Sequence, residues 1–472
     1  MWNFGFFYDL IHMFYFGNKY LSAYICELNL NTIEAMKQII FLIVLLITLG
    51  AFSYTSLRLY SWFKLLKPAF PVKDIGERIK LTLEVAFGQT KIMRRPLIGF
   101  IHAMVWWGFI VILFGSIEMI IDGLAGTERV LSFMGPFYEF LTAAGDIFAL
   151  IIAVAMIIFL VRRNIMHIAR FEGPEMKKIS HQDANLALTI ILFLMLSLLG
   201  MNTFYILDAI NLHPNHVVGL YPVSNFMAYA FYNMSPESIH FWHEFNWWAH
   251  IVLIFLFANI LPYSKHFHVF MSVPNVFLSR LQPLGYIDNM PNVTEEVKLM
   301  MDPNAAFAEP PADEEILRFG VKDVEDATWK NYLDSLACTQ CGRCTSVCPA
   351  NITGKLLSPR KVMINMRERM KEKAPNLVKD SGFDDNKSLL RDYISEEELW
   401  ACTLCNACAQ ECPININHPS LIVSLRRYLV MEESAAPAEL NTVFSNIENN
   451  GAPWQFSPED RLNWANEIYI ED

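Results

Sequence analysis

Residues 338–349 read CTQCGRCTSVCP, and residues 402–413 read CTLCNACAQECP. Both runs fit the pattern C-x2-C-x2-C-x3-C-P, in which three cysteines of one loop hold three corners of an iron–sulfur cube and the fourth reaches a neighbouring cluster. The two runs therefore predict two [4Fe–4S] clusters. Zinc is the alternative, but zinc sites usually take four ligands in two separated pairs, which leaves two complete runs with trailing prolines unexplained.

The same pattern assigns the ligands of each cluster. Each trailing proline is expected to end its loop and start a helix. Cys26, the ninth cysteine, lies far from both runs and is expected to be inert. Two clusters with every corner filled form a path for electrons and leave no open iron for a substrate. The predicted ligands are Cys338, Cys341, Cys344 and Cys412 for the first cluster, and Cys402, Cys405, Cys408 and Cys348 for the second.

The chain before residue 268 has a different character. Five stretches are apolar over the roughly 20 residues that a bilayer-spanning helix needs. Pro262 is expected to bend or end the last of them. The sequence thus predicts an all-α protein: a five-helix transmembrane bundle, then an α-helical ferredoxin-like domain with two [4Fe–4S] clusters. The predicted spans are about 36–58, 97–121, 141–161, 184–206 and 245–267.

The loops between these spans predict an orientation. Lys and Arg gather between the first and second spans and between the third and fourth, whereas the two opposite loops contain only Arg129. The positive-inside rule then places the N-terminus outside and everything after residue 268 in the cytoplasm, as in a multi-pass protein of the inner (cytoplasmic) membrane. A reducing cytoplasm suits the cysteine runs. The net charge of −11 argues against a nucleic-acid partner.

Histidines in apolar spans are candidate haem ligands, because an ionisable group in a bilayer is costly. His102 lies near the cytoplasmic start of the second span, and His250 and His268 are 18 residues apart on the fifth segment. On a regular helix these two face the same way, about 27 Å apart, whereas His266 faces nearly opposite. His102 and His268 would lie at one depth, as the axial ligands of a haem b must. The alternative is that they are interfacial or hydrogen-bonded histidines.

His250 lacks an obvious partner. Position 112 of the second span, where a matching histidine would lie, is Ile112. One haem b is therefore expected, and a second would need another ligand opposite His250. No C-x-x-C-H occurs, which excludes c-type haem. The other histidines that could serve are His216, His240 and His243.

Two carboxylates, Glu118 and Asp146, lie near the predicted outer ends of the second and third spans. They could carry protons released by a quinol. The alternative is that they only reach the headgroup region.

The segment 247–268, WWAHIVLIFLFANILPYSKHFH, resembles the last helix of the respiratory nitrate reductase gamma subunit. The match includes the 18-residue histidine spacing and the Pro-aromatic-Ser-basic element at 262–265. His102 resembles the first histidine of that family's second helix, but the family's second histidine, ten residues on, is missing. The resemblance implies that His102 and His268 ligate a cytoplasm-proximal haem b, and it leaves a distal haem on His250 in doubt.

The soluble half is similar to the iron–sulfur subunit of heterodisulfide reductase. Besides the cysteine runs, the matching features are 358–360 (SPR), 450–454 (NGAPW), Arg461 and Trp464. In fused relatives a cysteine-rich CCG domain follows at about this point. The resemblance implies a separate CCG-domain subunit that docks on the cytoplasmic domain.

The expected function is that of a membrane-bound electron-transfer subunit between a cytoplasmic redox partner and the quinone (menaquinone) pool. No Gly-rich turn for a flavin or nucleotide is present, so an electron-transfer flavoprotein or another soluble donor would be a partner. The alternative is a redox-sensing or scaffold protein without quinone turnover. The expected domains are an interfacial segment 1–30, the haem domain 31–268, a linker 269–320, the dicluster domain 321–430 and a partner-docking tail 431–472.

Overall fold

The computed structural model describes residues 35–212, 217–302 and 318–468. The interfacial segment 1–30, Cys26 and His216 therefore lie outside the described residues. The chain divides into two compact units. The first comprises the described residues up to Ser61, Asp74–Leu278 and Leu336–Cys341, and the second comprises Trp62–Lys73, Ser279–Ser335 and the residues from Gly342 onward.

The prediction of an all-α protein with five membrane helices is confirmed. Over the described ranges the chain forms helices and turns, with only two isolated β-bridges, and five helices are long and apolar enough to cross a membrane. Every one of them is longer than its predicted span. They are the N-terminal span Ala35–Phe63, α3 (Pro96–Ala125), α4 (Pro136–Asn164), α5 (Lys178–Leu212) and α7 (Pro236–Ile260).

The fifth segment is not one regular helix. Helix α7 ends at Ile260, directly before the turn that contains Pro262, as predicted. Two 3-10 turns, Leu261–Tyr263 and Lys265–Phe267, then lead into α8 (His268–Phe277). The regular helix that would align His250 with His268 is therefore not formed, because the proline lacks the N–H that would continue it.

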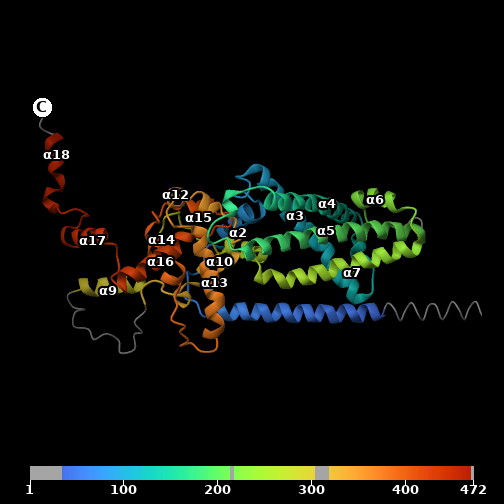
Figure 1. The fold of residues 1–472 in the computed structure, drawn as a ribbon, viewed down its shortest axis with the longest axis horizontal. Coiled ribbons are helices and arrows are strands. Elements are labelled where there is room, and N and C mark those ends of the chain that lie inside the picture. The colour runs from blue at the N-terminus through green and yellow to red at the C-terminus, as the bar shows by residue number, and fades with distance from the viewer. Residues whose placement is uncertain (1–34, 213–216, 303–317, 469–472) are drawn as a thin grey trace, which may run out of the picture. The chain divides into compact units, whose positions relative to one another are not determined.

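Helices α3, α4, α5 and α7 lie beside one another in the first unit, with α3 on α4, α4 on α5, and α5 on α7 (Figure 1). Their shared core includes Ile152 and Met156 of α4 and Leu194 of α5. A Cβ added at Gly108 of α3 would lie 2.7 Å from the ring of Phe148, so glycine permits the close approach of α3 to α4. Small residues commonly play this part between membrane helices.

A short helix, α6 (Pro222–Ala228), covers one end of α4 and α5. The carboxylate of Asp146 holds it there, accepting the backbone N–H groups of Val223 (2.7 Å) and Ser224 (3.0 Å). Asp146 is 1% exposed, so its side chain is buried inside the bundle. Its bonds satisfy donors that the start of α6 would otherwise leave open.

The first unit also contains two shorter helical segments before α3. Helix α2 (Ile75–Thr82) runs into a π-helical turn, Leu83–Phe87, and packs against α8. Arg78 of α2 donates a hydrogen bond of 2.9 Å to the backbone carbonyl of Phe277, which ties α2 to the end of α8.

The second unit consists of short helices around α13 (Pro359–Leu377). Asp323 caps a 3-10 turn at Val324–Asp326, and α10 (Trp329–Ala337) follows this turn. The remaining helices are α9 (Pro291–Met301), α11 (Arg343–Ser346), α12 (Pro349–Ile352), a π-helical turn (Leu389–Tyr393), α14 (Glu396–Trp400), α15 (Ala407–Glu411), α16 (His418–Met431), α17 (Ala438–Asn450), a 3-10 turn (Pro458–Leu462) and α18 (Asn463–Ile468).

A buried ion-pair network fixes α13 to the segments before and after it. Arg369 is 0% exposed and binds Asp323 with Nη2 (2.7 Å) and Asp385 with Nη1 (2.7 Å). Lys373, one turn later, also binds Asp323, at 2.8 Å. Because each of these charges has a partner, the unit tolerates them in its interior.

Candidate functional site

The two cysteine loops share one backbone conformation. In the first, Gln340 and Gly342 have φ values of 60° and 74°, and in the second, Leu404 and Asn406 have φ values of 52° and 59°. Both pairs flank the second cysteine of their run. Left-handed residues of this kind turn successive N–H groups toward one concave side, as at many iron–sulfur sites. The N–H of Leu404 donates a hydrogen bond of 3.4 Å to the Sγ atom of Cys402.

The segments after the loops differ between the two runs. Cys348 is the N-cap of α12, which starts at Pro349 as predicted. Pro413 starts no helix, and this prediction is wrong. Asn417 caps α16 instead, accepting the N–H of Ser420 at 3.3 Å, so the helix begins five residues after the proline.

The structure brings together the four cysteines predicted for the second cluster. Cys348, Cys402, Cys405 and Cys408 line one cavity that encloses about 340 Å³ of empty space. Burial, together with the smaller effect of the thiols of Cys402 and Cys348, raises the pKa of Cys408 to about 12. Iron would reverse this effect, because metal binding releases the thiol protons and supplies the compensating charge.

The cysteines of the first set are less exposed. Cys338, Cys344 and Cys412 are buried, and Cys341 is half-buried. Cys344 lies on α11 and Cys412 directly follows α15, and these two helices pack together. The packing places the later part of the first run beside the end of the second run, as crossed ligation of two clusters requires.

Three histidines gather where the fifth segment leaves the membrane helix. The rings of His266 and His268 are 5.7 Å apart. Burial lowers the pKa of His266 well below its ordinary value, and the nearby His268 and His102 lower it further. The prediction that His266 faces away from His268 is therefore wrong, because it assumed a regular helix through Pro262.

His268 is arranged as a metal ligand would be. Its Nδ1–H donates to the backbone carbonyl of Lys265 at 3.3 Å, which leaves Nε2 available. Burial lowers the pKa of His268 to about 4, so the imidazole is neutral at pH 7, as ligation requires.

His250 occupies a separate cavity. It is 2% exposed, and its Nδ1 bonds the carbonyl of Leu194 (2.9 Å) and the hydroxyl of Ser197 (3.0 Å). Nε2 is again left available. About 620 Å³ of empty space, partly open to the outside, adjoins His250 and Ile112, and no other histidine of the described chain lines it.

The remaining candidates lie elsewhere. His240 is exposed and pairs with Asp208 at 3.4 Å. His243 is buried and lines a different cavity. Glu118 is 4% exposed and accepts hydrogen bonds of 3.0 Å from the N–H of Leu131 and the hydroxyl of Tyr138, so it too lies inside the protein.

Comparisons with known proteins support the cluster domain. The family model described as a 4Fe-4S dicluster domain matches residues 337–416. The chain is 29% identical to the probable iron-sulfur-binding oxidoreductase FadF of Bacillus subtilis, over 91% of this chain and 61% of that protein. It is 28% identical to the EtfAB:quinone oxidoreductase of Syntrophomonas wolfei, over 84% of this chain and 55% of that protein.

A further match covers a smaller part of the chain. One component of the dihydromethanophenazine:CoB–CoM heterodisulfide reductase of Methanosarcina mazei is 27% identical over 32% of this chain and 37% of its own length. The chain spans about three fifths or less of the length of these curated relatives. No solved structure matches. Residues 337–416 are therefore a dicluster domain for two [4Fe–4S] clusters, in a chain that is homologous to these iron–sulfur oxidoreductases and precedes that domain with five membrane-length helices.

Proposed function

We propose that this chain is the membrane-bound electron-transfer subunit of a heterodisulfide reductase-like quinone oxidoreductase. It passes electrons between a cytoplasmic redox partner and the quinone pool. The observation that carries the proposal is the gathering of His102, His266 and His268 at one end of a membrane bundle in a chain that also has a dicluster domain. His268, a neutral imidazole whose Nδ1 is held by the carbonyl of Lys265 and whose Nε2 is available, suits the iron of a haem b.

In this proposal the eight cysteines hold the clusters in the crossed arrangement. Cys402, Cys405, Cys408 and Cys348 hold the second cluster, as their shared cavity supports. Cys338, Cys341, Cys344 and Cys412 hold the first. The clusters supply one-electron transfer, and the protein places them in series and sets their potentials through burial and N–H···S bonds.

For the haem, His102 and His268 are the proposed axial ligands, as in the nitrate reductase gamma subunit that the segment 247–268 resembles. The carbonyl of Lys265 fixes the tautomer of His268 and orients its ring, an arrangement common around metal-bound histidines. His266 is close enough to replace either ligand. A second haem would rest on His250, and its other ligand would not come from position 112.

The proposed setting is the inner (cytoplasmic) membrane, with the N-terminus outside and the clusters in the cytoplasm, on the distribution of Lys and Arg among the loops. The relatives' names support the partners: one is an EtfAB:quinone oxidoreductase, and another is part of a heterodisulfide reductase. The proposed partners are a CCG-domain subunit and an electron-transfer flavoprotein or another soluble donor. The proposed division into segments 1–30, 31–268, 269–320, 321–430 and 431–472 follows the sequence.

The test is a dithionite-reduced minus oxidised visible spectrum of the detergent-purified chain, with pyridine haemochrome and iron determination. The proposal expects b-type haem beside two clusters, and oxidation of that haem by an added quinone. The histidine variants His102→Ala and His268→Ala should lose the haem, whereas His240→Ala, exposed on α7, should keep it.

Intact clusters without haem would defeat this function and favour a redox sensor or scaffold. If His268→Ala retains haem and His266→Ala loses it, the proposed function stands and His266 is the axial ligand in place of His268.

A further inference from the structure

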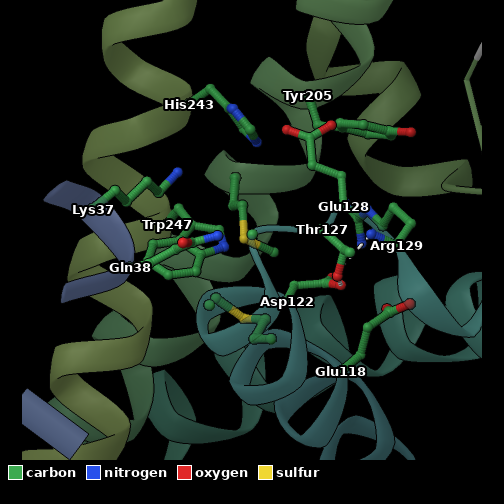
Figure 2. Close-up of a pocket in the computed structure, with 14 residues that line it drawn as sticks. Lys37, Gln38, Glu118, Asp122, Thr127, Glu128, Arg129, Tyr205, His243 and Trp247 are labelled. Atoms are coloured by element: carbon green, nitrogen blue, oxygen red, sulfur yellow. Dashed lines mark hydrogen bonds between the residues drawn. The ribbon is translucent and has the colours of Figure 1, made fainter. Parts of the chain in front are cut away.

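A cavity with polar walls opens at the other end of the membrane bundle. It encloses about 810 Å³ of empty space, including the part that is open to solvent. Its walls come from the N-terminal span, α3, α5, α7 and the loop after α3 (Figure 2). Glu118 of this wall is 16 residues beyond His102 on α3, about 24 Å farther along the helix axis.

Several charged groups of the cavity are already engaged. Asp122 accepts three hydrogen bonds of 2.7, 2.9 and 3.1 Å from the loop 127–130, and so closes the end of α3. The ammonium group of Lys37 binds the carboxylate of Glu244 at 2.7 Å. These groups shape the cavity and are not available to a ligand without breaking existing bonds.

His243 is the exception. It is 8% exposed, and its imidazole makes no hydrogen bond within the described ranges. Figure 2 shows the ring directed into the cavity, between Lys37 and Tyr205. The ring nitrogens of His243 stay accessible from the cavity, so they can form a hydrogen bond with a molecule that occupies it.

The rest of the lining indicates what kind of ligand. Trp247 and the thioethers of Met119 and Met201 offer a flat, polarisable apolar surface. The carboxylates of Glu118, Asp122 and Glu128 outnumber the cationic side chains of Lys37 and Arg129 in the lining, which disfavours an anion such as a lipid phosphate. A neutral planar ring with hydrogen-bonding oxygens fits both conditions.

We infer that this cavity binds the quinone ring, with His243 hydrogen-bonded to one quinone oxygen. The inference rests on the proposed function and adds a place and a proton-exchange group to it. The cavity shares four wall residues with the cavity of His250, so a redox centre held by His250 would be its neighbour. The shared residues are Glu118, Met119, Arg129 and Met201.

The reaction at this site is the reduction of one quinone by two electrons and two protons to one quinol. The electrons arrive singly from the chain's metal centres, and each converts one carbonyl of the quinone toward a hydroxyl as a proton is added. His243 exchanges the proton at the oxygen that it binds. Glu128, on the loop after α3, is the second proton-exchange group, and the exposed residues Thr127 and Glu128 connect the cavity with water. Quinol oxidation is the same process in reverse.

The first experiment locates the ring. The purified chain in lipid nanodiscs is illuminated with an azido-ubiquinone, and the labelled peptides are mapped with and without excess menadione. Label on the segments 118–129 or 243–247 that menadione suppresses supports the inference. Label confined to other segments overturns it.

The second experiment separates binding from proton exchange. Reduction of the b-type haem by menadiol is followed by stopped flow. His243→Ala should lose the label and slow the reduction about 100-fold, the usual contribution of one acid–base group. His243→Gln should keep the label, since an amide still bonds the oxygen, and remain slow. His240→Ala, on the same helix but exposed, should match the wild type.

Dithionite should reduce the haem in every variant at the wild-type rate, which shows that the metal centre is intact. Wild-type rates with menadiol in His243→Ala would overturn the inference and leave the proposed function standing. If menadiol does not reduce the haem of the wild-type protein and the azido-ubiquinone does not label the chain, both the inference and the proposed function are refuted.

Discussion

Arg369→Met should destabilise the dicluster unit by about 3 kcal/mol, at the low end of the range for breaking a buried ion pair. The methionine keeps most of the apolar stem but removes hydrogen bonds of 2.7 Å to Asp323, to Asp385 and to the carbonyl of Lys387. Asp323 is 2% exposed and would stay charged in the interior. The cost is limited because Lys373 still binds Asp323 at 2.8 Å and the side chain of Asp385 is 28% exposed to water.

The assay is thermal loss of the cluster absorbance in the full chain in detergent. A destabilisation of about 3 kcal/mol should lower the apparent Tm by roughly 6–12 °C for a unit of this size. Asp385→Asn is the matched control, because it leaves the pair between Arg369 and Asp323 intact. Its cost should be about 1 kcal/mol, that of an ordinary hydrogen bond. An unchanged Tm in Arg369→Met, or an equal loss in Asp385→Asn, would refute the assignment of the stability to the buried pair.

Three further predictions concern Asp385, the cluster ligands and the haem ligand. Hydrogen bonds from Arg369 lower the pKa of Asp385 from 3.8 to about 2. The ionised carboxylate of Asp385 therefore contributes its full stability above pH 4, and this contribution is lost as the pH falls through 2. Between pH 4 and pH 2 the Tm should fall less steeply in Asp385→Asn than in the wild type. Cys348→Ser should alter the electron paramagnetic resonance signal of the second cluster and spare the first, and Cys412→Ser should do the reverse; the same signal lost in both would contradict crossed ligation. His268→Ala should reduce the haem-to-iron ratio, measured by pyridine haemochrome, at least about twofold, since a b-type haem is held only by its axial ligands and its pocket. An unchanged ratio would indicate that His266 is the axial ligand instead.

The sequence predicted the membrane helices well, because length and apolar content alone decide that a segment can span a bilayer. The sequence underestimated the lengths of these helices. An apolar stretch ends where polar residues begin, whereas a helix continues until its backbone hydrogen bonds end. A better signal was present: Pro96, Pro136 and Pro236 each begin a helix, in the position where a missing N–H costs nothing.

The cysteine sets could also be predicted, because the spacing rule is local and the fold only has to bring two such loops together. The histidines were harder. His266 was placed on the wrong side because the prediction followed helical periodicity through Pro262, where the backbone changes to 3-10 turns. His243 was named only as a spare ligand, since a sequence does not reveal which buried imidazole lacks a partner.

Asp146 shows a different limit. Its position near a helix end suggested a proton carrier, but Val223 and Ser224, more than 70 residues later in the chain, supply the N–H groups that it binds. Long-range pairing of this kind leaves no periodic signature. The same holds for Arg369, whose partners Asp323 and Asp385 flank it from two different segments.

The distance between the two ends of α3 has an energetic consequence. With the proposed orientation, an electron that travels from the histidine cluster to the His243 cavity crosses about 24 of the roughly 30 Å of the hydrocarbon layer. A full crossing is worth about 2.3 kcal/mol per charge at 100 mV, so a two-electron reduction there gains roughly 4 kcal/mol from a potential that is negative inside. The membrane potential would then help a weak reductant in the cytoplasm to reduce quinone, and the reverse reaction would store that energy.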